Sequence, residues 1–323
     1  MEIIESIASA KSLTAGCVLT IGNFDGVHLG HQRIIKEAQK AAGLTGAKTL
    51  VVMTFEPHPA AILHPEMAPR ILTPMPIKKR LLENLGVDCL IILKDSFDLL
   101  NLSPADFVDR FLMKHIRPKV IIEGQSFNFG YGRSGNAQTL KEMGATRSFD
   151  VVVVPAKEIK TGDSTFTCSS SIVRSFLEEG TVSKAKAVLG RAYRLVGPTV
   201  AGRGVGKQMG FPTVNIQPDE QIIPAEGVYA GLVETGDTLD DVCAPGRARP
   251  AAISIGRAKT FVSSHPLLVE AHILEDKVEG LSGKWLAMDF VARIRSQQRF
   301  ETKDRLAEQI AKDCATAKKI LSG

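Results

Sequence analysis

The first 160 residues alternate between two kinds of hydrophobic pattern. Continuous apolar runs rich in β-branched side chains predict buried strands at residues 16–21, 49–55, 87–93, 120–123 and 151–154. Between these runs the apolar residues recur at helical spacing, which predicts helices that begin near residues 28, 77 and 103. We expect these helices to end at Gly43, at Gly86 and near Phe111. Strands that alternate with helices are typical of an α/β fold, in which helices cover both faces of a parallel sheet.

The pattern changes near residue 190, where the segments become short and are separated by glycine and proline. Strand-like patterns fall at residues 193–200, 213–216, 227–233, 251–255, 267–274 and 285–294. Short strands of this kind predict a small antiparallel β-barrel. A terminal helix over residues 303–321 carries Leu306, Ile310, Cys314 and Ala317 on one stripe. We therefore expect two domains, residues 1–185 and residues 186–323.

The composition is that of a globular protein and excludes several other classes. Of the 323 residues, 44% are hydrophobic and 23% are charged, unlike a disordered chain. The net charge of +5 is spread without a basic block interleaved with aromatic residues, so we expect no nucleic-acid partner. No apolar run reaches the roughly 18 residues of a membrane span, and the first residues do not resemble a signal peptide.

The cysteines argue for a reducing compartment. They are odd in number, scattered, and never spaced as C-x-x-C, so neither a disulfide framework nor a zinc ribbon is supported. We therefore expect a cytoplasmic protein. The five are Cys17, Cys89, Cys168, Cys243 and Cys314.

The chemistry begins in the stretch Leu19-Thr-Ile-Gly-Asn-Phe-Asp-Gly-Val-His-Leu-Gly-His31. It reads as a strand, a tight turn at Gly22 and a helix N-terminus, where unpaired backbone N–H groups suit a phosphate. His28 and His31 are three apart and share a face of the first turn, while Gly30 lets a ligand approach the backbone. From spacing alone the histidines fit a phosphate contact, ordinary structural residues or a metal pair.

Two further segments follow predicted strands in the first domain. They are Phe55 to Pro59 and the glycine-rich stretch from Gly124 to Gly135. Because ligands of open α/β sheets lie beyond the carboxyl ends of the strands, these segments and residues 22–31 are expected to converge on one crevice. The alternative for the glycine-rich stretch is a plain surface loop.

The segment Cys168-Ser-Ser-Ser-Ile-Val-Arg174 precedes a predicted helix over residues 172–179. Serines are natural helix caps, which accounts for them without any ligand. Arg174 is different, because a cation in the first turn opposes the helix dipole. A bound phosphate, held by paired N–H donors, would explain an arginine at this position.

A second candidate site lies in the barrel half. The stretch from Gly202 to Asn215 is rich in glycine and basic residues, and a loop of this kind can cradle an anion or simply connect two strands. Thr213 and Asn215 lie two apart on one strand face, and their hard oxygen atoms suit Mg²⁺. Glu270, in an otherwise apolar strand, is either a general base or an outward-facing strand residue.

Two groups of motifs carry a resemblance to a known family. G-N-F-D-G-V-H-L-G-H at residues 22–31 resembles the H-x-G-H signature of nucleotidylyltransferases, in the long form of the bifunctional riboflavin kinase/FMN adenylyltransferases. The Ser170-Ser171-x-x-Arg174 pattern is similar to a second signature of that superfamily, and Gly210-Phe-Pro-Thr-Val-Asn215 resembles a riboflavin kinase motif. The resemblance is weaker at Ser126 and at residues 254–261 and 280–283, where the residues depart from the family pattern.

The resemblance implies a Rossmann-like adenylyltransferase domain followed by a kinase barrel, with roles for individual residues. Catalysis would depend on Glu270, His28 and His31. ATP in the first domain would be bound by Gly22, Asn23, Phe24, Asp25, His28, His31, Ser170, Ser171 and Arg174. The flavin there would contact Phe55, Phe127, Asn128 and Arg133. The kinase nucleotide would be bound by Gly202, Gly204, Gly206, Lys207, Gly210, Thr213 and Asn215, with Mg²⁺ on Thr213 and Asn215.

The implied function is FAD biosynthesis in two steps. ATP would phosphorylate riboflavin to FMN in the barrel, and a second ATP would adenylylate FMN to FAD with release of pyrophosphate. Flavoenzymes would be the eventual recipients of the FAD. The alternative is an FMN adenylyltransferase whose barrel is inactive and serves to bind flavin or to regulate.

Overall fold

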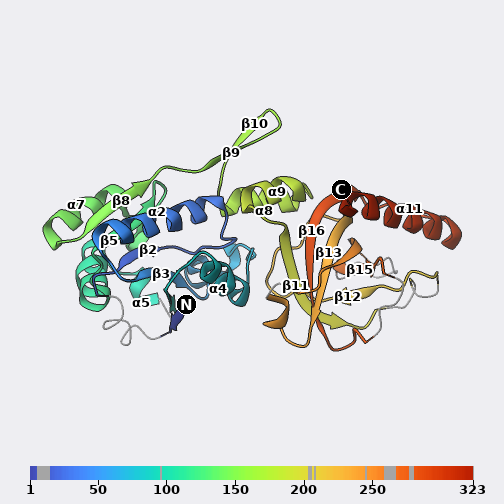
Figure 1. Cartoon of the computed structure of the whole chain (residues 1–323), viewed down its shortest axis with the longest axis horizontal. Coiled ribbons are helices and arrows are strands. Elements are labelled where there is room, and N and C mark those ends of the chain that lie inside the picture. Colours follow the sequence, from blue (N-terminus) through green and yellow to red (C-terminus); the bar gives the residue numbers. More distant parts are fainter. Residues whose placement is uncertain are drawn as a thin grey trace. The chain divides into compact units, whose positions relative to one another are not determined.

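The computed structural model describes residues 1–5, 15–94, 97–202, 206, 209–243, 246–257, 267–275 and 280–322 (Figure 1). The chain divides into two compact units. The N-terminal unit comprises Met1–Pro69, Lys78–Lys160 and Thr165–Cys168, and the C-terminal unit comprises Arg70–Ile77, Thr161–Ser164 and Ser169–Gly323. Residues 169–185 therefore pack within the C-terminal unit. Their assignment to the adenylyltransferase domain remains a prediction.

The N-terminal unit is built on a six-stranded sheet in which every neighbouring pair of strands is parallel. The strand order is β1-β4-β3-β2-β5-β8. The five predicted strands are confirmed, and only β1, which is too short to show a periodic pattern, escaped prediction. The strands are β1 (Glu2–Ile4), β2 (Val18–Ile21), β3 (Leu50–Phe55), β4 (Cys89–Leu93), β5 (Val120–Gly124) and β8 (Asp150–Val154).

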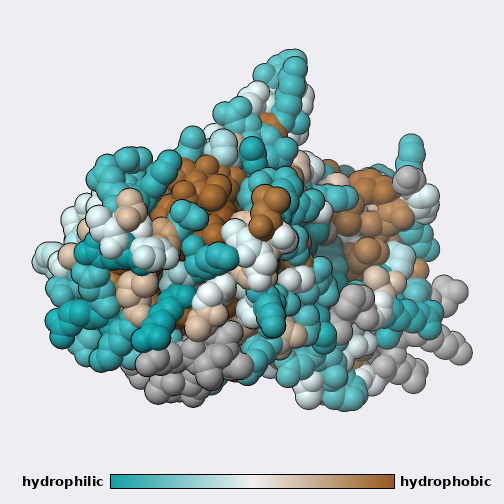
Figure 2. Space-filling model, turned by 60° about the vertical axis from the view of Figure 1, so that its left-hand side comes forward, coloured by the Kyte–Doolittle hydropathy of each residue, from teal (hydrophilic) through white to brown (hydrophobic). Residues whose placement is uncertain are grey.

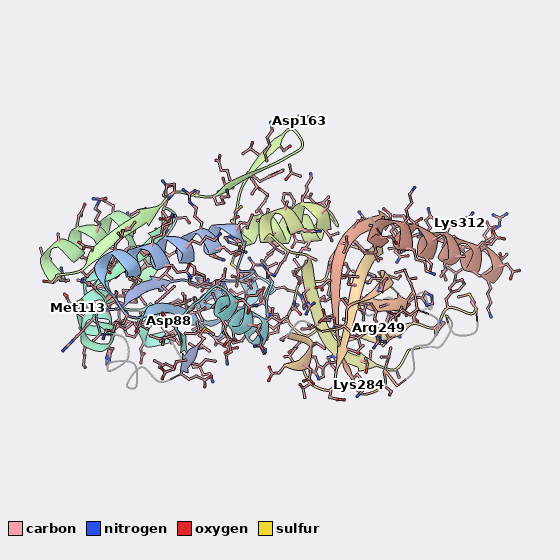
Figure 3. All side chains as sticks on the ribbon, in the orientation of Figure 1. Asp88, Met113, Asp163, Arg249, Lys284 and Lys312 are labelled. Carbon is pink, nitrogen blue, oxygen red and sulfur yellow. The ribbon has the colours of Figure 1, made fainter. Side chains whose placement is uncertain are left out.

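Helices and one short hairpin lie between these strands in the chain, and a second hairpin follows β8. The helices are α2 (Leu29–Thr45), α3 (Pro59–Leu63), η1 (Pro65–Met67), α4 (Met75–Asn84), α5 (Phe97–Leu100), α6 (Pro104–Asp106), η2 (Phe107–Ile116), η3 (Tyr131–Arg133) and α7 (Ala137–Arg147). The hairpins are formed by β6 (Asn128–Phe129) with β7 (Gly135–Asn136), and by β9 (Glu158–Thr161) with β10 (Ser164–Thr167). Asp163 marks the turn between β9 and β10 in Figure 3.

Two of the predicted helix ends were wrong. Helix α2 continues through Gly43 and is closed by Gly46, which adopts a left-handed conformation with φ of 68°. A glycine can occupy a helix interior at a modest cost, whereas the left-handed position after a helix strongly favours glycine. Helix α6 continues without a break into the π-helix η2 and ends at Ile116, beyond the predicted end at Phe111.

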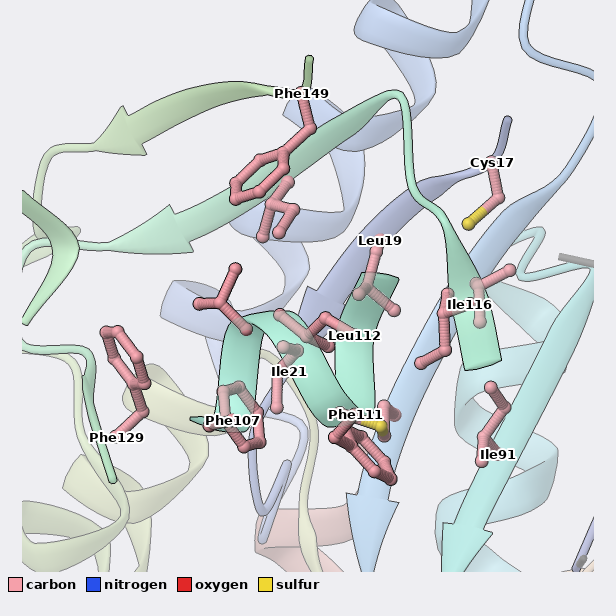
Figure 4. Close-up of a cluster of buried hydrophobic side chains, with 14 of the residues drawn as sticks. Cys17, Leu19, Ile21, Ile91, Phe107, Phe111, Leu112, Ile116, Phe129 and Phe149 are labelled. Atoms are coloured by element: carbon pink, nitrogen blue, oxygen red, sulfur yellow. The ribbon is translucent and has the colours of Figure 1, made fainter. Parts of the chain in front are cut away.

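The π-helix η2 supplies much of the hydrophobic core on one face of the sheet (Figure 4). Phe107, Phe111 and Leu112 pack there against Leu19 and Ile21 of β2. Alternate residues of a strand point to opposite faces, so the neighbouring Val18 and Thr20 face the other side, where α2 packs on β2, β3 and β5. Helices thus cover both faces of the sheet, as predicted.

The C-terminal unit contains the predicted antiparallel barrel. Its strands close in the order β11-β12-β15-β14-β13-β16. They are β11 (Tyr193–Val200), β12 (Val214–Ile216), β13 (Gly227–Gly236), β14 (Arg249–Arg257), β15 (Leu267–Ile273) and β16 (Trp285–Arg295). The helices of this unit are α8 (Ser170–Glu178), α9 (Val182–Leu189), η4 (Asp241–Cys243) and α11 (Lys303–Ser322).

Helix α11 packs across β13, β14 and β16. Its Cys314 and Ala317 join Ala230 and Ala252 in a small apolar cluster, while the exposed Lys312 points away from the barrel in Figure 3. The predicted stripe of four residues is thus divided. Cys314 and Ala317 are buried, but Leu306 and Ile310 remain partly exposed and line a cavity.

The surface agrees with a chain whose apolar residues are mostly inside. Within the part of the chain that the structure describes, no helix combines the length and the apolar character required to cross a bilayer. The face shown in Figure 2 is mostly hydrophilic, with hydrophobic side chains gathered in a few areas.

Candidate active sites

The first candidate site lies where the order of the sheet reverses. From β2 the chain adds β3 and β4 on one side, and it then crosses to place β5 on the other side of β2. The crevice beyond the carboxyl ends of β2 and β5 is the position where open α/β sheets bind ligands. The loop from Gly22 to His28 leaves β2 at this point, as predicted.

This loop has a strained backbone. Phe24 and Val27 adopt left-handed conformations with φ of 46° and 40°, although neither is glycine, and both side chains are buried. Such conformations cost of order 1–3 kcal/mol each and persist only where the surroundings hold them. The carbonyl oxygen of Asn23 accepts two hydrogen bonds, at 2.8 Å from Lys78 Nζ and at 3.1 Å from Thr54 Oγ1.

The two histidines are brought together at the start of α2. Their rings stack with centroids 3.6 Å apart, and Nδ1 of His28 accepts a hydrogen bond from the backbone N–H of His31 at 3.3 Å. His28 therefore caps the helix, and its neutral ring carries the proton on Nε2. Gly30 leaves room for this ring, since a Cβ at residue 30 would lie 2.9 Å from His28 Cε1.

His31 is a neutral group in this site. Burial, together with the neighbouring His28 and Lys78, lowers the pKa of His31 well below its usual value. Its Nδ1 atom is buried without a hydrogen-bond partner among the described residues. His31 can thus offer a polar contact but no positive charge. No cluster of three or more His, Cys, Asp or Glu able to hold a metal occurs among the described residues, so the metal interpretation of this pair gains no support.

The flavin residues implied by the resemblance lie at or near two strand ends. Phe55 ends β3 and, like Phe127, packs against the hydrophobic core. Asn128 donates a local hydrogen bond to the carbonyl of Ser126, and Arg133 is exposed with a left-handed φ of 59°. Their contact with a flavin remains a prediction.

Ser170, Ser171 and Arg174 lie in the C-terminal unit, on α8. The helix begins earlier than predicted, and its cap is Ser169, whose hydroxyl accepts the backbone N–H of Ile172. Arg174 is the fifth residue of α8 rather than a first-turn residue, so the helix-dipole argument for a phosphate there was wrong. Its Nε donates to the carbonyl of Arg70 at 2.8 Å. The ATP contacts of these three residues remain a prediction.

The second candidate site is a row of polar residues across three barrel strands. In the antiparallel pairing, Asn215 of β12 lies opposite Glu270 of β15, and Glu270 lies opposite Ser254 of β14. Directly opposed residues share one face of a sheet, with Cβ atoms roughly 5 Å apart. All three, with Thr213, line a cavity of about 620 Å³. Tertiary pairing thus unites residues that are 55 positions apart in the sequence, since 270 − 215 = 55.

The cavity has an apolar wall and an unsatisfied polar atom. Phe211, Phe300 and Leu306 contribute hydrophobic surface, which suits a flat aromatic ligand. The side-chain oxygen of Asn215 is buried without a hydrogen-bond partner among the described residues. Because such an atom is costly to leave unpaired, it fits a ligand for a hard cation such as Mg²⁺.

The glycine-rich stretch next to this row is in part described. Gly202, Gly210, Thr213 and Asn215 also line a second cavity of about 570 Å³. A Cβ at residue 202 would lie 2.1 Å from the Asn215 amide nitrogen, so only glycine fits there. Gly206 lines the first cavity. Gly204 and Lys207 lie outside the described residues.

The resemblance and the sequence patterns missed several residues at these sites. Lys78 and Thr54 bind the Asn23 carbonyl, but in the sequence they are an ordinary helix lysine and an ordinary strand threonine. Ser254 stands where the family pattern has another residue, yet it lies beside Glu270. Residues 258–261 of this divergent stretch lie outside the described residues. In the other divergent stretch, residues 280–283, the side chains of Leu281 and Ser282 line the second cavity.

The chain that combines this parallel α/β unit with this barrel is a transferase, as comparison with known families shows. Residues 10–168 match the family model for FAD synthetase, and residues 189–321 match the model for riboflavin kinase. The chain belongs to the family of bifunctional riboflavin kinase/FMN adenylyltransferases. Neither half of the chain lacks a match, so the alternative of an inactive, regulatory barrel gains no support.

Individual relatives extend over the whole chain. The bifunctional riboflavin kinase/FMN adenylyltransferase of Escherichia coli K12 is 32% identical, and the match covers 99% of this chain and 98% of that protein. The enzyme of the same name from Pseudomonas fluorescens is 31% identical, and the match again covers 99% of this chain and 98% of that protein. A solved structure described as a macrolide-efflux protein from Streptococcus pneumoniae is 27% identical, with a TM-score of 0.84 over 98% of this chain and 99% of that one.

Proposed function

We propose that this chain makes FAD from riboflavin in two reactions, one in each unit. The barrel transfers the γ-phosphoryl group of ATP to riboflavin and yields FMN and ADP. The N-terminal unit then joins FMN to the adenylyl group of a second ATP and releases pyrophosphate. The observation that carries this proposal is that one chain of this family has two candidate sites, the histidine pair in the N-terminal unit and the polar cavity in the barrel.

For the kinase reaction we assign the role of general base to Glu270. The riboflavin 5′-hydroxyl oxygen attacks the γ-phosphorus, its proton passes to the Glu270 carboxylate, and the bond to the ADP oxygen breaks. Support comes from the position of Glu270 between Asn215 and Ser254 on the wall of the cavity. The apolar side of that cavity, which includes Phe300 and Leu306, would hold the flavin ring.

We assign Mg²⁺ to the side-chain oxygens of Thr213 and Asn215. The unsatisfied oxygen of Asn215 and the closeness of Gly202 to its amide support this assignment. When bound, Mg²⁺ would neutralise charge on the ATP phosphates. The two side chains would fix the cation on the same strand face as Glu270.

For the adenylyl transfer we assign the binding of the triphosphate to His28, His31 and the N-terminus of α2. An FMN phosphate oxygen attacks the α-phosphorus of ATP, and the bond to pyrophosphate breaks. The attacking phosphate is already ionised, so the site needs no strong base. It needs positive charge fixed where negative charge develops, which Nε2–H of His28 and the positive end of the α2 dipole would provide.

The experiment that tests this proposal separates the two products. Purified protein is incubated with riboflavin, ATP and Mg²⁺, and FMN and FAD are quantified by chromatography. We expect His28→Ala to accumulate FMN without FAD. Glu270→Gln should lower riboflavin phosphorylation by about 10²–10⁴-fold while FAD still forms from added FMN.

Matched controls guard against effects on folding. His64→Ala is the control for His28→Ala and changes an exposed histidine just before η1. Glu308→Gln is the control for Glu270→Gln and changes an exposed glutamate on α11. Both controls should leave the rates of both reactions unchanged. If wild-type protein releases no pyrophosphate from ATP and FMN, the proposal fails for the N-terminal unit. If Glu270→Gln phosphorylates riboflavin at the wild-type rate, Glu270 is not the base.

We further propose the cytoplasm as the site of both reactions and flavoenzymes as the recipients of the FAD. All five cysteines are unpaired and buried, which agrees with a reducing compartment. The thiols give this proposal a simple check. Native protein purified without reductant should still contain five free thiols after unfolding in urea.

A further inference from the structure

Lys78 is a buried lysine that contacts the loop from Gly22 to His28 in the N-terminal unit. It lies on α4, its side chain is 7% exposed, and its Nζ donates to the carbonyl oxygen of Asn23 at 2.8 Å. Burying an ammonium group is expensive unless charge or hydrogen bonds compensate it. Asp25 in the loop and Glu56 after β3 supply part of that compensation, because both favour the charged form of Lys78.

The carbonyl that Lys78 holds is placed at the start of the strained backbone. Asn23 is followed directly by Phe24, the first of the two left-handed residues, and the loop ends at His28, which caps α2. Thr54 Oγ1 donates to the same carbonyl at 3.1 Å, so both lone pairs of that oxygen are used. The two donors thus fix one end of the loop while the His28 cap fixes the other.

Lys78 also acts on the histidine pair through its charge. It is one of the groups that lower the pKa of His31, together with burial and His28. His28 and Lys78 act on His31, and Asp25 in the loop and Glu56 after β3 act in turn on Lys78. Two further titratable residues lie close by: His58 contacts the Asn23 side chain, and Cys168 lies beside Gly30. Thr54 and Lys78 both hold the carbonyl, but only Lys78 also adds to the effect of burial and His28 in lowering the pKa of His31.

We propose that Lys78 is a positioning residue of the adenylyltransferase site, which holds the Asn23 carbonyl and so sets the conformation of the loop that presents His28 and His31. This inference rests on the proposed adenylyl transfer in the N-terminal unit. Lys78 acts in two ways that can be separated. It supplies a hydrogen bond, which it shares with Thr54, and a positive charge, which it does not share.

The test compares Lys78→Met with Thr54→Val in the full-length chain. A displaced loop moves the histidines by a fraction of an ångström or more, and misplacement of about 1 Å costs on the order of 10² in rate. We expect Lys78→Met to lower FAD formation from FMN and ATP by about 30–100-fold. Thr54→Val, which removes the neutral donor to the same carbonyl, should lower it by less than about 10-fold.

The pH profile distinguishes positioning from a general loss of structure. Removing the charge of Lys78 lets the pKa of His31 rise, so the acid limb of kcat/KM should move to higher pH in Lys78→Met. In Thr54→Val the charge stays, and the limb should not move. Lys78→Arg should recover part of the rate, because arginine keeps the charge and can donate to a carbonyl.

Two controls keep the outcome clear. Riboflavin phosphorylation by the same molecules should stay within twofold, because its proposed site lies in the other unit, and the urea midpoint of each variant reports whether the N-terminal unit is folded. Lys79→Met alters the next residue of α4, a partly exposed lysine that pairs only weakly with Glu5 at 4.0 Å, and should leave both reactions unchanged. Where Lys78→Met does not fold, Lys78→Gln replaces it, and the proposal then requires Lys78→Arg to be the faster of the two.

Equal losses and equal pH profiles in Lys78→Met and Thr54→Val would overturn the proposal, as would FAD formation by Lys78→Met within threefold of wild type. Wild-type protein that forms no FAD from FMN would instead refute the proposed function. The two failures are therefore distinguishable in one set of assays.

Discussion

A single methyl group at residue 30 should disable adenylyl transfer at little net cost to the stability of the chain. Gly30 is the second residue of α2, and its backbone is helical. A Cβ built there lies 2.9 Å from His28 Cε1, 3.0 Å from His28 Nδ1 and 3.2 Å from the Cys168 carbonyl oxygen. Ordinary contacts of a Cβ begin near 3.4 Å, so the His28 ring must move in Gly30→Ala.

The magnitude follows from what the ring does. Its Nδ1 caps α2, and the ring is assigned to the proposed triphosphate site, so a shift disturbs both roles. A displacement approaching 1 Å typically costs on the order of 10² in rate, and the loss of one fixed donor costs about 10²–10³. Alanine is favoured over glycine in a helix by about 1 kcal/mol, which offsets much of the roughly 0.5–2 kcal/mol that a disturbed cap costs. We expect FAD formation to fall at least 100-fold without a matching loss of stability.

The same helix offers a matched control. Gly43 lies inside α2, is exposed, and has nothing within 4 Å of a built Cβ. Gly43→Ala should therefore raise the stability of the chain by about 1 kcal/mol and leave both reactions unchanged. FAD formation from FMN and ATP, riboflavin phosphorylation and urea unfolding are measured for both variants. A Gly30→Ala protein that makes FAD within threefold of Gly43→Ala would refute the geometry described for His28.

Three further predictions concern buried polar groups. Burial raises the pKa of Glu123 well above its ordinary value of 4.5. The free energy of unfolding therefore falls as the pH rises above 4.5, by up to about 1.4 kcal/mol per pH unit, until the pH reaches the pKa in the folded state. Glu123→Gln can still accept the Ile21 N–H, so its stability advantage over wild type in urea should grow from pH 5 to pH 8. A constant difference across that range would show that Glu123 ionises normally. Asp313→Asn should destabilise the barrel by about 3–5 kcal/mol, because it leaves the largely buried Arg295 without its carboxylate, and an unchanged urea midpoint would contradict this. Burial raises the pKa of the Cys17 thiol to about 12, so a thiol reagent at pH 8 should label Cys17 only after unfolding, and rapid labelling of native protein would oppose it.

The sequence alone determined the class of fold and was enough to propose most of the site residues. Buried strands are continuous apolar runs, so five strands of the parallel sheet and the strands of the barrel could be placed within a few residues, although the short β1 could not. The histidine pair at residues 28 and 31 could be assigned to a helix start, because strand, glycine turn and helix follow each other locally. Local signals were weaker at helix ends. Gly43 and Gly46 could each have ended α2, and only the left-handed backbone conformation of Gly46 shows that the helix ends there.

Only the tertiary structure decided which distant residues meet. The register of the barrel places Glu270 between Asn215 and Ser254, and no spacing along the chain encodes that register. Lys78 shows the same limit, since its helix position is unremarkable until the fold brings its ammonium group to the Asn23 carbonyl. A hydrophobic pattern records which face of an element is buried, but a hydrogen bond across elements depends on how those elements pack.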